Sequence, residues 1–250
     1  MRASINRLPL VKRCFSLDSI SASSDPQRRF IRDPSWFLSP TIARLSLKPQ
    51  EDVDSMSLTI APGHRSFYQK KGWILLYDIF LEEEWQAIYD HIPSSGYDQW
   101  RGSPAMKRIA TKKNRASIAS QLVGIPILRL AFDYTFHMDS HHFSLPKEMK
   151  PSSLTELPIA LLFPLTPNGD YPPKSALFVS LHDDLADSPP PHYPGPWMGI
   201  AYATAQSRYR NTPTEPFSRW MKQQGYSAGD ALISPTNPLF DFQREGINRF

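Results

Sequence analysis

The sequence has a single cysteine, Cys14, among 250 residues. One thiol cannot form a disulfide within the chain, and it cannot supply the several thiolates of a structural zinc site. Disulfide-stabilised secreted scaffolds and zinc fingers are therefore excluded. Nothing in the composition requires an oxidising compartment.

Long apolar runs and glycines are also scarce. No run approaches the roughly 18 apolar residues of a membrane-spanning helix, although 40% of the residues are apolar and 12% are aromatic. Only 11 residues are glycine, whereas the 25 prolines are about twice the usual share of roughly 5%. Because proline breaks helices and avoids central strands, this composition disfavours long helical bundles and all-parallel sheets. It indicates a soluble globular protein.

The first 60 residues show no sustained hydrophobic period and are rich in serine, arginine and proline. They predict a mobile arm, followed by one domain over residues 61–250. Residues 2–24 carry four basic residues and one acid, a composition typical of transit peptides, so the arm is either an ordinary polar tail or a targeting signal. We expect a cytoplasmic protein, or one exported through this arm.

Hydrophobic periodicity predicts a series of short elements in the domain. An aromatic-rich apolar run over 73–80 predicts a buried strand, and three glutamates before apolar residues at helical spacing predict a helix over 82–92. Further helices are expected over 116–124 and 216–224. Further strands are expected over 125–132, 157–163, 175–181, 197–203 and 230–234. This order predicts an α+β protein with a sandwich or barrel core.

The net charge of +4 is small but unevenly distributed. No acid occurs between Asp98 and Asp133, where seven basic residues accumulate: Arg101, Lys107, Arg108, Lys112, Lys113, Arg115 and Arg129. The stretch 101–115 predicts either a contact surface for an anionic partner or an ordinary solvated face. No aromatic side chain is interleaved there to stack on bases, so we do not expect DNA binding.

The histidines suggest a metal site. Five of the seven fall between His137 and His192, and His137-Met138-Asp139 forms a His-x-Asp triplet. In an extended chain, residues i and i+2 point to the same side, so the triplet can offer an imidazole and a carboxylate to one metal. A distant second histidine would complete the two-histidine, one-carboxylate set of non-haem Fe(II). The alternative is a surface loop with a polar histidine and aspartate.

The order of these segments resembles that of the phytanoyl-CoA dioxygenase-like proteins, which belong to the Fe(II)/2-oxoglutarate oxygenase superfamily. The resemblance rests on the apolar run and acidic helix over 67–85, the triplet 137–139, the apolar strand ending at His182 and the Gly229-Asp230 segment. It implies a double-stranded β-helix core of the jelly-roll or cupin-like type, with flanking N-terminal helices. Residues 199–211 and 224–230 also resemble a family from obligate intracellular bacteria that has no assigned activity.

The resemblance implies roles for individual residues. His137 and Asp139 become two ligands of Fe(II), and His182 becomes a histidine near the site that does not bind the metal. Arg244 or Arg249 becomes the clamp for a carboxylate of 2-oxoglutarate, a task that suits a planar, bidentate guanidinium.

The sequence departs from the family at the distal histidine. The segment after Asp230 contains Asn237 where a histidine is expected, so the third ligand is left open among His141, His142 and Asn237. Two functions follow from this. One is a divergent Fe(II)/2-oxoglutarate-dependent dioxygenase of unknown substrate, and the other is a catalytically inactive binding or host-interaction module on the same fold.

Overall fold

The computed structural model describes residues 59–90, 96–138, 143–166, 171–182, 194–234 and 236–243. The chain divides into two units, Met1–Leu38 and Ser39–Phe250, and every described residue belongs to the second. All but the last two residues of the predicted 1–60 arm fall outside the described residues. The same holds for Asp139, His141, His142, His192, Arg244 and Arg249.

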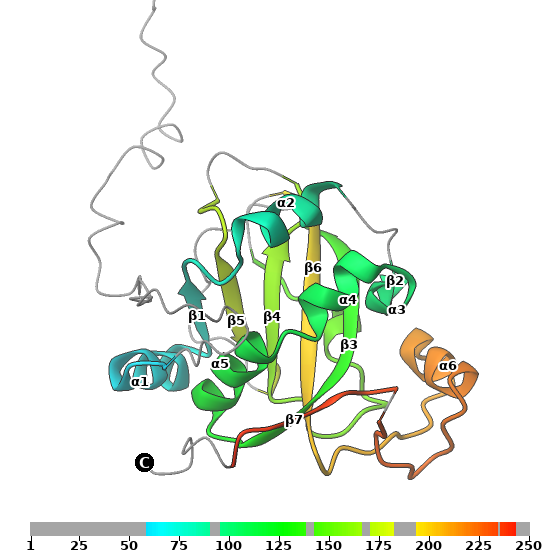
Figure 1. The fold of residues 1–250 in the computed structure, drawn as a ribbon. Helices are drawn as coiled ribbons and strands as arrows, with labels where there is room; N and C mark the ends of the chain where they lie inside the picture. The colour runs from blue at the N-terminus through cyan, green and yellow to red at the C-terminus, as the bar shows by residue number, and fades with distance from the viewer. Residues whose placement is uncertain are drawn as a thin grey trace, which may run out of the picture. The chain divides into compact units, whose positions relative to one another are not determined.

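One antiparallel sheet of seven strands organises the described residues (Figure 1). Six strands follow the order β1-β5-β4-β6-β3-β2, and β7 pairs with a different part of β3. Their bounds are β1 (Trp73–Leu76), β2 (Gly96–Tyr97), β3 (Ile127–Met138), β4 (Ile159–Pro164), β5 (Ala176–Ser180), β6 (Gly195–Thr204) and β7 (Leu239–Asp241). Strands β1, β4 and β5 are buried at every position, which explains why they are continuous apolar runs rather than alternating patterns.

Six helices and one short 3-10 helix accompany the sheet within the described ranges. They are α1 (Pro62–Lys71), α2 (Glu82–Asp90), α3 (Gln99–Gly102), α4 (Pro104–Ala110), α5 (Lys113–Val123), the 3-10 helix η3 (Lys147–Met149) and α6 (Pro216–Gln223). Helix α4 begins with a proline at its first position, and the Ser103 hydroxyl accepts a hydrogen bond from the Met106 N–H at 3.3 Å. Helix α5 ends at Gly124, whose φ of 74° is the left-handed conformation that glycine adopts without strain. None of the helices in the described part of the chain is long and apolar enough to cross a bilayer.

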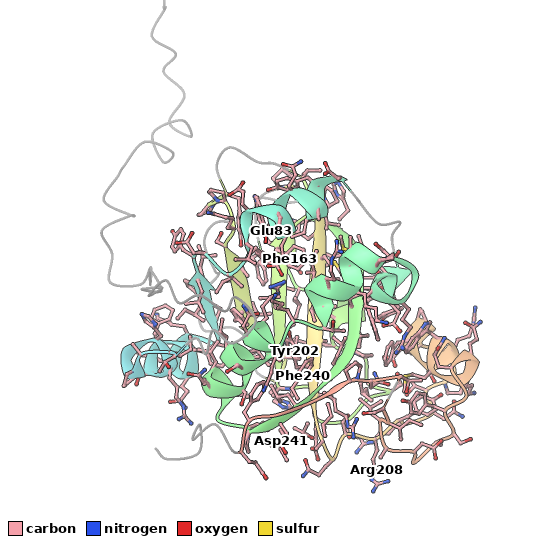
Figure 2. The ribbon with its side chains drawn as sticks, viewed as in Figure 1. Glu83, Phe163, Tyr202, Arg208, Phe240 and Asp241 are labelled. Atoms are coloured by element: carbon pink, nitrogen blue, oxygen red, sulfur yellow. The ribbon has the colours of Figure 1, made fainter. Side chains whose placement is uncertain are left out.

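Helices α2, α3, α4 and α5 cover one face of the sheet (Figure 1). Phe163 and Tyr202 mark this face in Figure 2, and the ring of Phe80, just before α2, contacts Phe163 with centroids 4.9 Å apart. The opposite face is covered by η3 and α6, because Met149 packs against Gly199 and the Phe217 ring lies 4.7 Å from that of Phe132. The sheet is therefore buried on both sides.

A β-bulge lies in the middle of β3. The register between β3 and β6 shifts between Leu130 and Phe132, so Ala131 is the extra residue. Beyond the bulge, Asp133 pairs with Ile200 and shares the helix-covered face, because its carboxylate accepts a hydrogen bond from the Trp100 N–H of α3 at 2.9 Å. By strand alternation, Thr135 and His137 point to that same face.

The α+β prediction is confirmed as a mixture of helices and antiparallel sheet, and most expected elements are present. The strand expected over 230–234 is wrong, since only Ala231 forms an isolated bridge. There the Asp230 carboxylate accepts from the Ser227 N–H at 2.7 Å, and the Asn237 N–H bonds the Ile233 carbonyl at 2.7 Å, so the chain turns. The strand expected over 73–80 ends at Leu76, two residues before Asp78 adopts a φ of 56°.

Candidate functional site

The first predicted metal ligand, His137, lies near the end of β3. It pairs with Pro196 of β6, and the next residue, Met138, pairs with Gly195. Its side chain is exposed although its neighbours Phe136 and Met138 are buried. His137 is therefore accessible to a ligand at the rim of the sheet, on the helix-covered side. Its predicted partner, Asp139, lies outside the described residues.

His182 lies at the other end of the sheet. It follows β5, whose last residue, Ser180, is aligned with Leu130 of β3 through Ile159 and Tyr202 of the intervening strands. His137 is seven residues further along β3, which corresponds to about 20 Å at ~3.3 Å per residue. The two histidines cannot approach one metal in this arrangement.

Asn237 is not the third ligand. Its side chain is fully buried, and its amide nitrogen donates to the carbonyls of Leu130 and Ala131 at 2.9 and 2.7 Å. Its amide oxygen accepts from the Tyr226 hydroxyl at 2.7 Å. Both ends of the amide are thus used to hold the β-bulge, about 20 Å from His137 along β3. Of the three residues left open as the third ligand, Asn237 is therefore excluded, whereas His141 and His142 lie outside the described residues.

Two carboxyl groups that the sequence did not single out lie buried under α3. Asp133 is fully buried and Asp98 is 7% exposed, and the Asp98 N–H donates to the Asp133 carbonyl at 2.9 Å. Oδ2 of Asp133 accepts from the Trp100 N–H, whereas its Oδ1 has no hydrogen-bond partner among the described residues. We refer to Asp98 and Asp133 as the acid pair.

Burial governs the protonation of the acid pair. It raises the pKa of Asp133 to about 7, and the nearby Asp98 charge raises it too, against the lowering effect of the backbone N–H of Trp100. Burial likewise raises the pKa of Asp98 to about 6, opposed by the Arg101 guanidinium. Burial therefore favours the protonated form of both carboxyl groups, whereas the Arg101 guanidinium favours the ionised form of Asp98.

Arg101 connects the acid pair to the surface. Its Nε donates to Asp98 and its Nη2 donates to the Thr236 carbonyl. The guanidinium lies 4.3 Å from the Trp100 ring centroid and 5.7 Å from that of Trp220. These contacts hold Arg101 in one orientation, with its side chain still 24% exposed.

The basic stretch 101–115 does not form one surface. Arg115 is fully buried, its two terminal nitrogens donate to the Glu84 carboxylate at 3.0 and 3.1 Å, and its guanidinium lies over the Phe80 ring. Arg115 is therefore part of the interior and is removed from the predicted contact surface. Lys107 and Arg108, in contrast, are exposed on α4.

Within the described ranges, no group of three or more histidine, cysteine or acidic side chains lies close enough together to hold a metal ion. Of the two predicted metal ligands, His137 and Asp139, only His137 belongs to the described residues.

Neither a scan against protein-family models nor a search of curated proteins finds a match. Solved structures do match. The "non-heme alpha ketoglutarate dependent carbocyclase SnoK from nogalamycin biosynthesis" is 12% identical, and the alignment covers 74% of this chain and 98% of that chain with a TM-score of 0.54. The corresponding epimerase SnoN is 16% identical, with 70% and 96% of the two chains covered and a TM-score of 0.54.

This chain has the fold of the non-haem 2-oxoglutarate-dependent enzymes. SnoN has also been solved in complex with Fe3+, alpha ketoglutarate and nogalamycin RO, and that structure matches with a TM-score of 0.51 at 15% identity. At such identities the likeness establishes the fold alone. It supports the oxygenase-like fold that the segment order predicted.

On this oxygenase fold, sequence reasoning missed the acid pair, although a signal was present. Asp98 and Asp133 are the two acids that bound the acid-free stretch, and Asp133 interrupts an otherwise apolar strand, Leu130-Ala-Phe-Asp-Tyr-Thr-Phe136. A lone acid at a core-facing strand position indicates a buried carboxyl group.

Proposed function

We propose that this chain is a divergent Fe(II)/2-oxoglutarate-dependent dioxygenase with a double-stranded β-helix core, and that His137 and Asp139 hold the metal at the Met138 end of β3. The observation that carries the proposal is the exposed imidazole of His137 at a strand end of an oxygenase fold. An accessible imidazole followed two residues later by a carboxylate is the donor pair that non-haem iron uses.

The register of β3 and β6 supports one further candidate for the third donor. Met138 is paired with Gly195, so the chain entering β6 starts beside the chain leaving β3. His192 precedes Gly195 by three residues, and covalent chain length keeps its Cα within about 11 Å of the Gly195 Cα. We therefore add His192 to His141 and His142 as a candidate for the third ligand.

The remaining roles follow from the ligand chemistry. When bound, Fe(II) and 2-oxoglutarate supply the oxidising chemistry of a hydroxylation, while the chain binds and orients the reactants. Arg244 or Arg249 is the proposed partner of the 2-oxoglutarate carboxylate. Both follow β7, whose last residue, Asp241, pairs with Ile127, ten residues before His137 and about 30 Å from it along β3. The proposal therefore requires the chain after β7 to return toward the metal end of β3, so that one of these arginines contacts 2-oxoglutarate there.

An anaerobic Fe(II) titration of the full chain by calorimetry tests the metal site. We expect micromolar binding that weakens at least about tenfold in His137→Ala and in Asp139→Asn, since each removes a ligand, and 2-oxoglutarate should tighten Fe(II) binding. Arg244→Gln and Arg249→Gln, made separately, identify which arginine carries this effect. Turnover of 2-oxoglutarate to succinate is the second readout.

His182→Ala is the matched control, because it removes an exposed histidine from the opposite end of the sheet. It should leave Fe(II) affinity unchanged. Equal losses in His137→Ala and His182→Ala, or the absence of Fe(II) binding by the unmodified chain, would overturn the dioxygenase proposal.

One observation favours a second candidate, a metal-free binding module on the same fold. The segment expected to carry the distal histidine is committed instead to holding the bulge through Asn237. Absence of Fe(II) binding together with retained binding of an organic anion would support this module.

A further inference from the structure

An open cleft lies between helices α3 and α4 and the segment that leads into β7. Its volume is about 600 Å³, and its lining residues are Trp100, Arg101, Lys107, Thr111, Ser234, Pro238 and Leu239. Leu239 pairs with Arg129, eight residues before His137 on β3, and Trp100 bonds Asp133, four residues before His137. The lining therefore lies between about 13 and 25 Å from His137 along the strand. It is therefore a separate site from the proposed metal centre.

The lining contains two cations and no acid. Arg101 uses Nε for Asp98 and Nη2 for the Thr236 carbonyl, which leaves Nη1 as the nitrogen not engaged in these two bonds. Lys107 contributes an exposed ammonium group from α4. Because Arg101 is already oriented by its stacking on Trp100, binding an anion costs it little further side-chain entropy.

Arg129 contacts the cleft lining at Ser234. Its Nη1 donates to the Ser234 hydroxyl oxygen at 3.2 Å and to the Asn237 carbonyl at 3.0 Å, and its Nε is buried with no hydrogen-bond partner among the described residues. Since the Ser234 oxygen accepts from Arg129, its own O–H is available to donate elsewhere. Neither acceptor is a carboxylate, so the charge of Arg129 adds to the positive potential of the cleft.

Part of the cleft lining is apolar. Leu239 is 43% exposed, and Ile233, which precedes the lining residue Ser234, is 56% exposed; these are the large hydrophobic side chains exposed within the described ranges. Leu239 lines the cleft together with Pro238 and Trp100. Exposed apolar groups beside a cluster of hydrogen-bond donors are typical of ligand sites.

The geometry points to a binding site for a small organic oxyanion: a phosphate-type head held by Arg101, Lys107 and the Ser234 hydroxyl, with an apolar group against Leu239 and Pro238. The predicted contact between the basic stretch 101–115 and an anionic partner is thereby limited to two of its basic residues, Arg101 and Lys107, together with Ser234, Pro238 and Leu239.

Phenyl phosphate is the probe, compared with inorganic phosphate and with phenol by calorimetry on the full chain at low ionic strength. We expect phenyl phosphate to bind at least about tenfold more tightly than phenol, which lacks the charge. It should bind about three- to tenfold more tightly than inorganic phosphate, which lacks the ring. Binding should weaken as salt screens the cations.

Lys107→Gln should weaken phenyl phosphate binding about three- to tenfold, as expected for loss of one charged hydrogen bond. Arg108→Gln is the matched control, because it removes an exposed positive charge from the adjacent α4 position outside the lining, and it should change affinity less than about twofold. Ser234→Ala provides a second lining variant, and circular dichroism verifies that each variant is folded.

Equal effects of Lys107→Gln and Arg108→Gln, or equal affinities for phenyl phosphate and phenol, would overturn this site. His137→Ala should leave phenyl phosphate binding intact. The anion site and the metal site therefore succeed or fail independently.

Discussion

Replacing Asp133 by asparagine isolates the effect of the buried acid pair on stability. The substitution keeps an oxygen that can accept from the Trp100 N–H and removes the charge that burial disfavours. It also places an amide N–H2 where Oδ1 has no partner among the described residues. Burying this amide N–H2 without a partner costs about 1–3 kcal/mol at every pH. Only the removal of the carboxylate charge changes stability in a way that depends on pH.

The expected magnitude follows from the pKa of Asp133. This pKa is about 7 in the folded chain, against 3.8 for an ordinary aspartate. A difference of about three pKa units corresponds to about 4 kcal/mol. Because the folded state holds the proton more tightly, this stabilisation is fully present below pH 3.8 and is lost as the pH rises to about 7. The unmodified chain therefore loses stability over this window relative to Asp133→Asn.

The assay is urea denaturation followed by circular dichroism, at half-unit steps from pH 4 to pH 8. We expect the unfolding free energy of Asp133→Asn minus that of the unmodified chain to rise by about 2–4 kcal/mol across this range. Asp98 titrates in the same window and is coupled to Asp133, so the rise is shared between the two groups. Asp241→Asn removes an exposed carboxylate and should give a nearly constant difference.

A difference that stays constant with pH in Asp133→Asn would refute the buried-acid argument. So would a difference that falls as the pH rises, because it would mean that the folded chain stabilises the ionised form of Asp133.

Three further substitutions test the packing around the site, each by urea denaturation. Asn237→Ala should destabilise the chain by about 3 kcal/mol, because it leaves the Leu130 and Ala131 carbonyls without their amide donor and removes one acceptor from the Tyr226 hydroxyl, and it should not change Fe(II) affinity. Gly199→Ala should cost about 1–3 kcal/mol, since a Cβ there would lie 2.5 Å from Met149 Cε, and Met149→Ala in the same chain should recover part of the loss. Glu84→Gln should cost about 3–5 kcal/mol because it leaves Arg115 buried without its countercharge. Losses below about 0.5 kcal/mol would contradict the packing described for each position.

The sequence was informative where a single local pattern determines the structure. The three glutamates before an apolar helical repeat correctly predicted α2, and the apolar runs between prolines correctly predicted β4, β5 and β6. Helices α3 and α4 were not predicted, because their lengths of four and seven residues show too little periodicity. The same limit applies to β7, whose three residues depend on pairing with β3.

The candidate sites were less predictable because they depend on contacts between distant segments. The anion cleft joins α3 and α4 to residues more than a hundred positions later, a proximity that charge patterning alone cannot indicate. Arg115, in contrast, is more buried than its sequence neighbours predicted. Its place among exposed-looking lysines predicted a solvated residue, yet its contact with Glu84, 31 positions away, takes it into the core.

Asn237 shows why a missing histidine does not by itself determine the fate of the site. The carbonyls of Leu130 and Ala131 both point at one nitrogen, and the amide N–H2 offers two donors on that atom. Its oxygen accepts from Tyr226 at the same time. An imidazole nitrogen carries at most one hydrogen, so a histidine at this position could not satisfy both carbonyls of the bulge. The identity of residue 237 is therefore determined by the geometry of β3, and the question of metal binding depends on the chain around His137, at the other end of that strand.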